Sequence, residues 1–124
     1  MATLIIVEDD HLIRKSIQML LELEGYEIHG AENGQEALTL LERCRTSKTP
    51  CLILLDLMMP VMDGAEFRRR QLEDPELRDV PVVIITGKGD LRDLAELRPL
   101  SVIRKPFKPD VILTLLREHC PLKR

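Results

Sequence analysis

Carboxylate side chains stand where two apolar runs of this sequence end. The run Leu4–Val7 is followed at once by Glu8 and Asp9. The run Cys51–Leu55 is followed by Asp56. Carboxylates brought close together repel one another, and a buried charge is costly unless something pairs with it. A hard divalent cation is the usual partner, and Mg²⁺ takes oxygen ligands in proteins. We therefore expect Glu8, Asp9 and Asp56 to bind Mg²⁺.

A hydroxyl and an ammonium group follow two further apolar runs. Thr86 comes directly after Val82–Ile85, and Lys105 comes shortly after Ser101–Ile103. A metal ion, an ammonium group and a hydroxyl directed at one carboxylate suit the stabilisation of phosphoryl charge. In such a site Asp56 can itself be the nucleophile and form an aspartyl phosphate. Taken singly, each residue also has an ordinary interpretation, because an Asp at a strand end is often only a turn or cap residue.

Two kinds of segment alternate along the chain. Short runs rich in Ile, Val and Leu predict five strands, at Leu4–Val7, Tyr26–His29, Cys51–Leu55, Val82–Ile85 and Ser101–Ile103. Apolar residues with helical spacing predict five helices that follow these strands. The first helix carries an apolar stripe from Leu12 to Leu23. Asp10 stands at its start, where a negative charge is favourable, so we expect it to point away from the other carboxylates.

This alternation predicts an α/β fold, a doubly wound five-stranded parallel sheet with helices on both faces. In an open sheet of this kind the functional site lies beyond the carboxyl ends of the strands. The carboxylates, Thr86 and Lys105 should therefore meet in one cleft. The chain has 124 residues, of which 44% are hydrophobic, and this suits one domain with its own core. We expect a single domain over residues 1–124.

Composition argues against several classes of protein. The net charge of −3 provides no basic face for nucleic acid. No apolar run is long enough to span a bilayer and no signal peptide precedes the first strand, so we expect a cytoplasmic protein without a membrane partner.

Cys44, Cys51 and Cys120 lack metal-ligand spacing, and we expect them to be free thiols. The cluster Arg68–Arg70 is expected to form the solvated face of a helix.

The polar residues at the strand ends lie in motifs that resemble the receiver domain of two-component response regulators. The motifs are VEDD at Val7–Asp10, LLDLMMPVMDG at Leu54–Gly64, ITG at Ile85–Gly87 and KPF at Lys105–Phe107. They occur in the order of the family, and the resemblance covers essentially the whole chain. The resemblance implies a flavodoxin-like fold with the strand order 2-1-3-4-5.

The resemblance also implies a role for each residue of the cleft. Asp56 is the implied phosphoacceptor. The implied Mg²⁺ ligands are Glu8, Asp9, Asp56 and the backbone carbonyl of Met58. Thr86 is the implied switch hydroxyl, and Lys105 is the implied cationic partner of the phosphoryl group. The two prolines and the glycine of these motifs are implied to shape the chain around the site: Pro60 and Gly64 in the loop after the acceptor, and Pro106 as a cis residue.

The sequence departs from the family pattern in two places. An aromatic residue commonly stands three positions before the lysine, where this chain has Val102, which is too small and stiff to act as the same rotameric reporter. The stretch from Thr86 to Lys105 is also a few residues shorter than usual. The missing residues must come from the fourth helix or its loops, so we expect a short or irregular helix over residues 90–97. Phosphorylation would then be read by a reshaped partner surface.

Three kinds of function fit the residues to different degrees. The best fit is a stand-alone receiver, and not an enzyme with a separate substrate. Such a receiver would be phosphorylated by a sensor histidine kinase or a phosphotransfer protein and would act on an unknown protein target. The alternative is a pseudo-receiver that binds partners without phosphorylation, which Val102 and the short fourth helix favour. A phosphatase of the aspartyl-phosphate class would need an acid where Met58 stands, and a flavodoxin-like electron carrier would need a glycine-rich phosphate loop where Glu8 and Asp9 stand.

Overall fold

The computed structural model describes residues 2–44, 49–59, 61–87 and 94–122. Within these ranges five strands, four α-helices and one 3₁₀-helix follow one another. In chain order they are β1 (Thr3–Val7), α1 (His11–Leu23), β2 (Glu27–Ala31), α2 (Gly34–Cys44), β3 (Leu52–Asp56), α3 (Gly64–Glu73), β4 (Val82–Thr86), the 3₁₀-helix η1 (Ala95–Leu97), β5 (Ser101–Arg104) and α4 (Pro109–His119).

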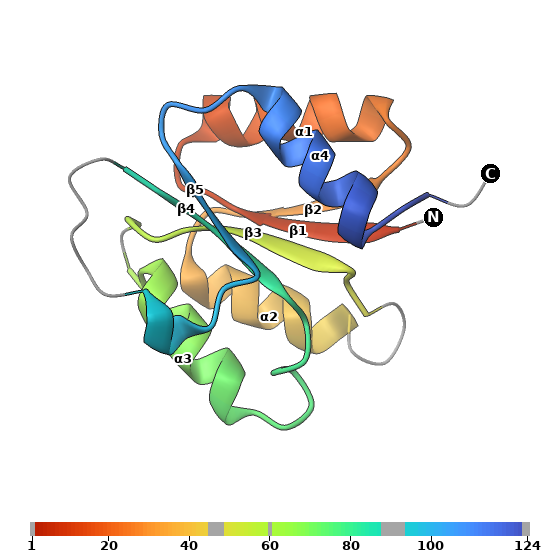
Figure 1. The fold of residues 1–124 in the computed structure, drawn as a ribbon. Helices are drawn as coiled ribbons and strands as arrows, with labels where there is room; N and C mark the ends of the chain where they lie inside the picture. Colours follow the sequence, from red (N-terminus) through yellow and green to blue (C-terminus); the bar gives the residue numbers. More distant parts are fainter. Residues whose placement is uncertain (1, 45–48, 60, 88–93, 123–124) are drawn as a thin grey trace.

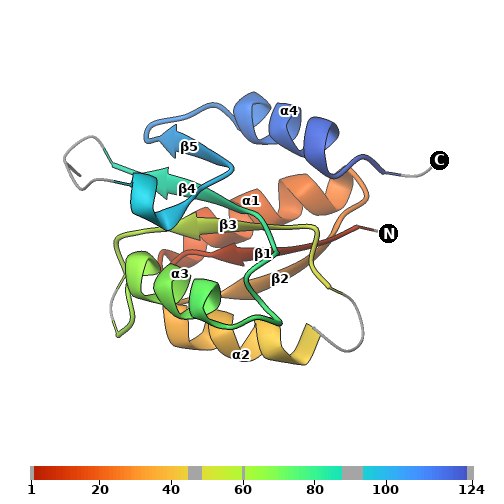
Figure 2. The ribbon, with the colours of Figure 1, turned by 60° about the horizontal axis from the view of Figure 1, so that its bottom comes forward.

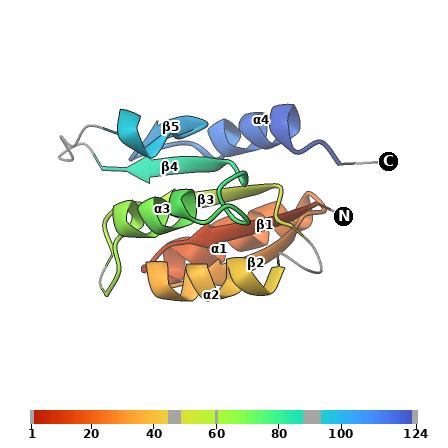
Figure 3. The ribbon, with the colours of Figure 1, turned by 90° about the horizontal axis from the view of Figure 1, so that it is seen from below.

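The five strands form one parallel sheet in the order β2-β1-β3-β4-β5, which confirms the predicted doubly wound fold and its strand order. Helices α1 and α4 cover one face of the sheet, and α2 and α3 cover the other (Figure 1). The strands point in the same direction, so their carboxyl ends lie along the same edge (Figure 2). Helix α4 lies with β4 and β5 toward one side of the sheet, whereas α1 lies with β1 and β2 toward the other (Figure 3).

Two buried clusters, one on each face, hold the helices to the sheet. Every residue of β1, β3 and β4 is buried, as expected for strands covered on both sides. On the α2 and α3 face, Leu41 and Phe67 are buried against the sheet. On the α1 and α4 face, Leu21, Ile112 and Leu116 do the same. The core is therefore built almost wholly from aliphatic side chains.

The first helix begins and ends as its sequence predicts, but its apolar stripe is only partly buried. Asp10 caps α1, since its side chain accepts hydrogen bonds from the backbone N–H groups of Leu12 and Ile13. Gly25 follows the helix with a φ of +107°, a conformation that glycine adopts readily. Within the predicted stripe, Leu21 is buried, whereas Leu12 and Leu23 are 76% and 86% exposed.

The fourth predicted helix is the main difference from the regular pattern. The described residues between β4 and β5 contain the 3₁₀-helix η1, which agrees with the short or irregular helix predicted there. The rest of the expected helix, residues 88–93, lies outside the described residues. Arg98 ends η1 in the left-handed region with a φ of +48°, and Pro99 follows it.

The prediction that Arg68–Arg70 form a solvated face is wrong for Arg68, which is only 4% exposed. Its Nε atom donates to the Leu97 carbonyl at 2.8 Å, and its Nη2 atom donates to the Arg98 carbonyl at 2.9 Å. Successive side chains of an α-helix point in different directions, so a run of three arginines cannot share one face. Arg68 therefore ties η1 to α3.

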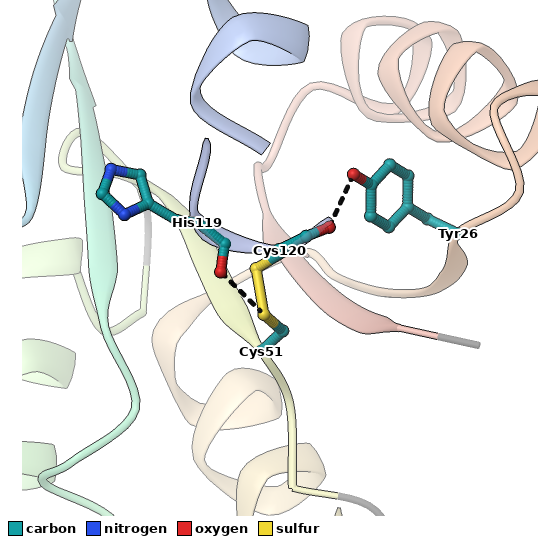
Figure 4. Close-up of a disulfide and its surroundings, with 4 residues drawn as sticks. All are labelled: Tyr26, Cys51, His119 and Cys120. Atoms are coloured by element: carbon teal, nitrogen blue, oxygen red, sulfur yellow. Dashed lines mark hydrogen bonds between the residues drawn. A yellow bond between two sulfur atoms is a disulfide. The ribbon is translucent and has the colours of Figure 1, made fainter. Parts of the chain in front are cut away.

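The prediction of three free thiols is also wrong. Cys51 and Cys120 form a disulfide (Figure 4). Among the described residues, Cys44 is a free, buried cysteine. The two bonded residues are 69 positions apart, but the fold brings the residue before β3 beside the end of α4. Spacing along the sequence cannot show such a pair.

Candidate functional site

The carboxylates at the ends of β1 and β3 lie together. The register of β1 against β3 sets Val7 beside Leu55, so the residues that follow them leave the sheet at the same level. Glu8 and Asp56 are each only 4% exposed, whereas Asp9 is exposed. Carboxylate oxygens of these three acids lie within 4.8 Å of one another. The structure therefore brings together the acids that the sequence singled out.

Lys105 faces the two buried acids. Its Nζ atom lies 3.1 Å from Asp56 Oδ2 and 3.4 Å from Glu8 Oε1. Its backbone N–H donates to the Thr86 carbonyl at 2.8 Å, which continues the pairing of β4 with β5 and fixes where the lysine leaves the sheet. The Lys105–Pro106 peptide bond is cis. Burial alone would lower the pKa of Lys105, but the hydrogen bond and charge of Asp56, with those of Glu8, raise it above its usual value.

The electrostatics of the acids are those of a site that lacks positive charge. Burial, then the neighbouring Asp56 carboxylate, raises the pKa of Glu8 to about 8, although Lys105 acts in the opposite direction. Glu8 Oε2 is buried and has no hydrogen-bond partner among the described residues. The positive charge of Lys105 therefore does not fully offset the negative charge of the carboxylate cluster. Three carboxylates with an unpartnered oxygen fit an oxygen-liganded divalent cation such as Mg²⁺.

Thr86 ends β4 beside this cluster. The residue is fully buried, and its Oγ1 atom has no hydrogen-bond partner in the part of the chain that the structure describes. Glu8 Oε2 and Thr86 Oγ1 are the two buried side-chain oxygens in that part that lack a partner. Unpaired buried polar atoms are rare in folded proteins and call for an explanation. Both unpaired oxygens belong to residues at strand ends of one sheet edge.

Two residues that follow β3, Met58 and Gly64, lie close to Asp56 and Leu57. The backbone N–H of Met58 donates to Asp56 Oδ1 at 3.1 Å, so residue 58 lies against the acid. Gly64, the first residue of α3, donates to the Leu57 carbonyl at 2.9 Å. A Cβ atom at Gly64 would clash with the Asp56 carbonyl oxygen and would stand 2.8 Å from Leu57 Cα. Only glycine permits α3 to begin this close to β3. The Met58 carbonyl stays a predicted ligand.

Arg14 supports the site, although no pattern in the sequence marks it. The Nη1 atom of Arg14 donates to the Glu8 carbonyl at 2.6 Å, and its Nη2 atom lies 3.2 Å from His11 Nδ1. Arg14 thereby fixes the turn between β1 and α1, which presents Glu8 and Asp9. Its position on α1, six residues beyond Glu8, carries no motif, so only the folded turn shows the contact. Val102, the position that departs from the family pattern, lies on β5 and is 36% exposed.

The fold and the cleft define a class of protein: a doubly wound domain with three acids, a lysine and a threonine at the carboxyl ends of its strands. The family model described as the response regulator receiver domain matches residues 4–117. The chain belongs to this family of signalling modules, whose members serve as phosphoryl acceptors in two-component systems. The likeness stated from the sequence motifs is therefore confirmed.

Curated relatives include proteins of different lengths. The phosphate regulon transcriptional regulatory protein PhoB of Pseudomonas aeruginosa is 36% identical over 120 residues, which cover 93% of this chain and 50% of the relative. Sporulation initiation phosphotransferase F of Bacillus subtilis is 35% identical over 124 residues, covering 97% of this chain and 94% of the relative. The chain thus spans about half of the first relative and nearly all of the second.

Solved structures agree with the family assignment. The chemotaxis response regulator CheY4 of Vibrio cholerae has a TM-score of 0.83 at 27% identity, covering 95% of this chain and 98% of that chain. The receiver domain of a sensor histidine kinase from Pseudomonas aeruginosa has a TM-score of 0.84 at 26% identity, covering 95% and 96%. That structure has a magnesium ion coordinated in its active-site cleft. Within the described residues of this chain, we find no helix with the length and apolarity needed to cross a membrane.

Proposed function

We propose that the protein is a Mg²⁺-dependent phosphoryl acceptor whose acceptor residue is Asp56. The phosphoryl group would come from a sensor histidine kinase or a phosphotransfer protein, the donors that receiver domains use. The observation that carries the proposal is the position of the Asp56 carboxylate, which is buried and lies 3.1 Å from the Lys105 ammonium group. An acid held in this way beside two other acids has no evident structural purpose, but it suits nucleophilic attack on phosphorus.

Each residue of the cleft has a part in this chemistry. An oxygen of Asp56 attacks the phosphorus atom, and the bond between phosphorus and the donor nitrogen breaks. Lys105 moves its ion pair from the free carboxylate to the phosphoryl oxygens. Thr86 Oγ1 donates to one of these oxygens and so gains the partner that it lacks.

The metal ligands would be the three acids and a backbone group. Glu8, Asp9 and Asp56, with the carbonyl of Met58, would hold Mg²⁺. The bound ion would supply positive charge that offsets the negative charge of the transferred group. The orphaned Glu8 Oε2 atom and the all-oxygen donor set support this assignment.

Phosphorylation would be read by another protein. It adds about −1.5 to −2 charges at one point, which can bias the equilibrium between two surfaces. Thr86 pairs with Arg104 in the register of β4 against β5, so a movement at Thr86 reaches β5 directly. Val102 on β5 and Val111 on α4 are 36% and 43% exposed and offer apolar contacts for a partner. The proposed output therefore uses the surface of β5 and α4.

We further propose that residues 1–124 act as one stand-alone domain in the cytoplasm, without nucleic-acid or membrane partners and without a separate enzymatic substrate. Sporulation initiation phosphotransferase F matches this chain over 94% of its own length, whereas the phosphate regulon regulatory protein matches it over 50%. The second candidate function is a pseudo-receiver that binds its partner without phosphorylation. The short η1 segment and the exposed Val102 favour it, because they alter the surface that a phosphorylation-driven switch would use.

Intact mass after incubation with acetyl phosphate and Mg²⁺ tests the proposal. Wild type should gain the mass of one phosphoryl group, and Asp56→Asn should not. Asp10→Asn is the matched control, because Asn caps a helix as well as Asp and residue 10 lies outside the acid cluster. Asp10→Asn should gain the group like wild type. If wild type binds Mg²⁺ but gains no mass, the pseudo-receiver function replaces the proposal.

A further inference from the structure

A disulfide joins two elements at the end of the molecule remote from the acid cluster. Cys51 immediately precedes β3, and Cys120 is the C-cap residue of α4. Their sulfur atoms are bonded, and their Cα atoms are 6.1 Å apart, a normal span for a disulfide. From Cys51 the strand runs five residues to Asp56, about 17 Å at the usual rise per residue. The bond therefore lies outside the proposed phosphorylation chemistry.

The two sulfur atoms differ in their surroundings (Figure 4). Cys120 is 2% exposed and is held at both backbone groups: its N–H donates to the Leu116 carbonyl at 2.7 Å, and its carbonyl accepts the Tyr26 hydroxyl at 2.8 Å. Cys51 is partly exposed. Its Sγ atom lies 3.6 Å from the His119 carbonyl oxygen. A disulfide sulfur carries no hydrogen, but a Cys51 thiol could donate to this oxygen, so the site suits both oxidation states.

We propose that Cys51 and Cys120 form a reversible redox-modification site that exchanges with small thiols and disulfides. In the reducing direction, the thiolate of a dithiol attacks Cys51 Sγ, the accessible sulfur. The Cys51–Cys120 bond breaks, and Cys120 leaves as a thiolate that takes up a proton. The second thiolate of the dithiol then releases Cys51. The dithiol is oxidised to a disulfide as the protein gains two electrons and two protons.

In the oxidising direction, a small disulfide such as glutathione disulfide accepts those two electrons and is released as two thiols. Disulfides that occur in a reducing compartment are usually transient or redox-sensing. The cytoplasmic location proposed above makes the dithiol the resting state, with the bond forming when the thiol pool is oxidised.

The bond controls how firmly α4 is held to the sheet. Helix α4 packs through Ile112 and Leu116 on the face that β3 shares, and the disulfide fixes its last residue to the start of that strand. The bond also closes a long loop, because its cysteines are 69 positions apart, and a cross-link of this kind restricts the unfolded chain. Oxidation should therefore stabilise the domain and slow the opening of the last turn of α4. This turn adjoins the surface proposed for output.

Thiol counting tests the pairing. The protein is equilibrated with glutathione disulfide, unfolded, alkylated and weighed, with and without prior reduction. Wild type should take up one alkyl group without reduction and three after it, and Cys44→Ser should take up none and then two. The proposal is overturned if wild type takes up three groups without reduction, or if Cys44 is one of the protected thiols.

Hydrogen exchange tests the consequence. On reduction of the wild type, the amides of Leu116 and Cys120 should exchange at least about tenfold faster, and the thermal midpoint should fall. Cys51→Ser should behave like reduced wild type whether or not reductant is present. The comparison of oxidised with reduced wild type stays informative even if the Cys51→Ser variant does not fold. Equal exchange rates in the two states would show that the bond does not clamp α4 and would refute the proposal.

Discussion

Replacing Arg68 with methionine should destabilise the domain much more than the same change at either neighbouring arginine. The buried guanidinium donates to the Leu97 carbonyl at 2.8 Å, to Gln71 Oε1 at 2.7 Å and to the Arg98 carbonyl at 2.9 Å. Burial, followed by the charge of Arg98, lowers the pKa of Arg68, so the group is held at some cost. Its acceptors are neutral, since no carboxylate among the described residues is bonded to it.

The size of the loss follows from these contacts. Each buried acceptor left without a donor costs about 1–3 kcal/mol, and Arg68→Met leaves two such acceptors, the Leu97 carbonyl and Gln71 Oε1, together with the part-buried Arg98 carbonyl. The sum is partly offset, because a methionine needs no desolvation of charge and fills part of the space. We expect a net loss of about 3 kcal/mol in the free energy of unfolding. For a domain of this size that corresponds to a fall of roughly 10 °C in the melting temperature.

Urea unfolding of Arg68→Met and Arg69→Met measures the difference. Arg69 is half exposed, and its ion pairs to Glu66 and Glu96 are 3.8 Å long, so its replacement should change stability by less than about 0.5 kcal/mol. Similar small losses in both variants would refute the conclusion that Arg68 holds η1 against α3. A large loss in both would show that the helix, and not the buried contact, is sensitive.

Two further predictions concern the acid cluster. Gly64→Ala should lower the free energy of unfolding, measured in urea, and slow phosphorylation, measured by intact mass, because its Cβ would clash with the Asp56 carbonyl oxygen. Wild-type values for both would contradict this. The pKa of Glu8 is raised from 4.5 to about 8, so without metal its stabilising effect is complete below pH 4.5 and is lost as the pH rises through about 8. Without metal, the free energy of unfolding of the wild type should therefore fall between pH 4.5 and about 8 relative to that of Glu8→Gln. Equal dependence of stability on pH in the two proteins would refute the prediction.

The sheet and most of the cleft could be predicted from the sequence, because the residue at which each buried strand ends can be recognised from the end of its apolar run. Continuous apolar runs identify buried parallel strands, and parallel strands deliver the residues that follow them to one edge of the sheet. Glu8, Asp56 and Lys105 therefore met as expected, with the lysine within 3.4 Å of both acids. Strand β2, predicted over Tyr26–His29 and observed over Glu27–Ala31, is less completely buried than β1, β3 and β4.

The remaining features depend on contacts between distant segments. The Cys51–Cys120 bond spans 69 positions, and no local pattern marks it. Arg68 looks like part of a charged surface until the fold places the Leu97 carbonyl beside it. The small number of residues between β4 and β5 indicated a short or irregular helix there. It did not indicate that Arg68 of α3 would bind the backbone of η1.

We expect that Asp56, and no other acid of this cleft and loop, accepts the phosphoryl group. The most direct test is to phosphorylate the wild type with acetyl phosphate and Mg²⁺, cleave it after Lys48 and Arg68, and fragment the peptide 49–68 by mass spectrometry. This peptide contains both Asp56 and Asp63, the cap of α3. The fragments should place the phosphoryl group on Asp56. A phosphoryl group on Asp63, or on another peptide, would contradict it.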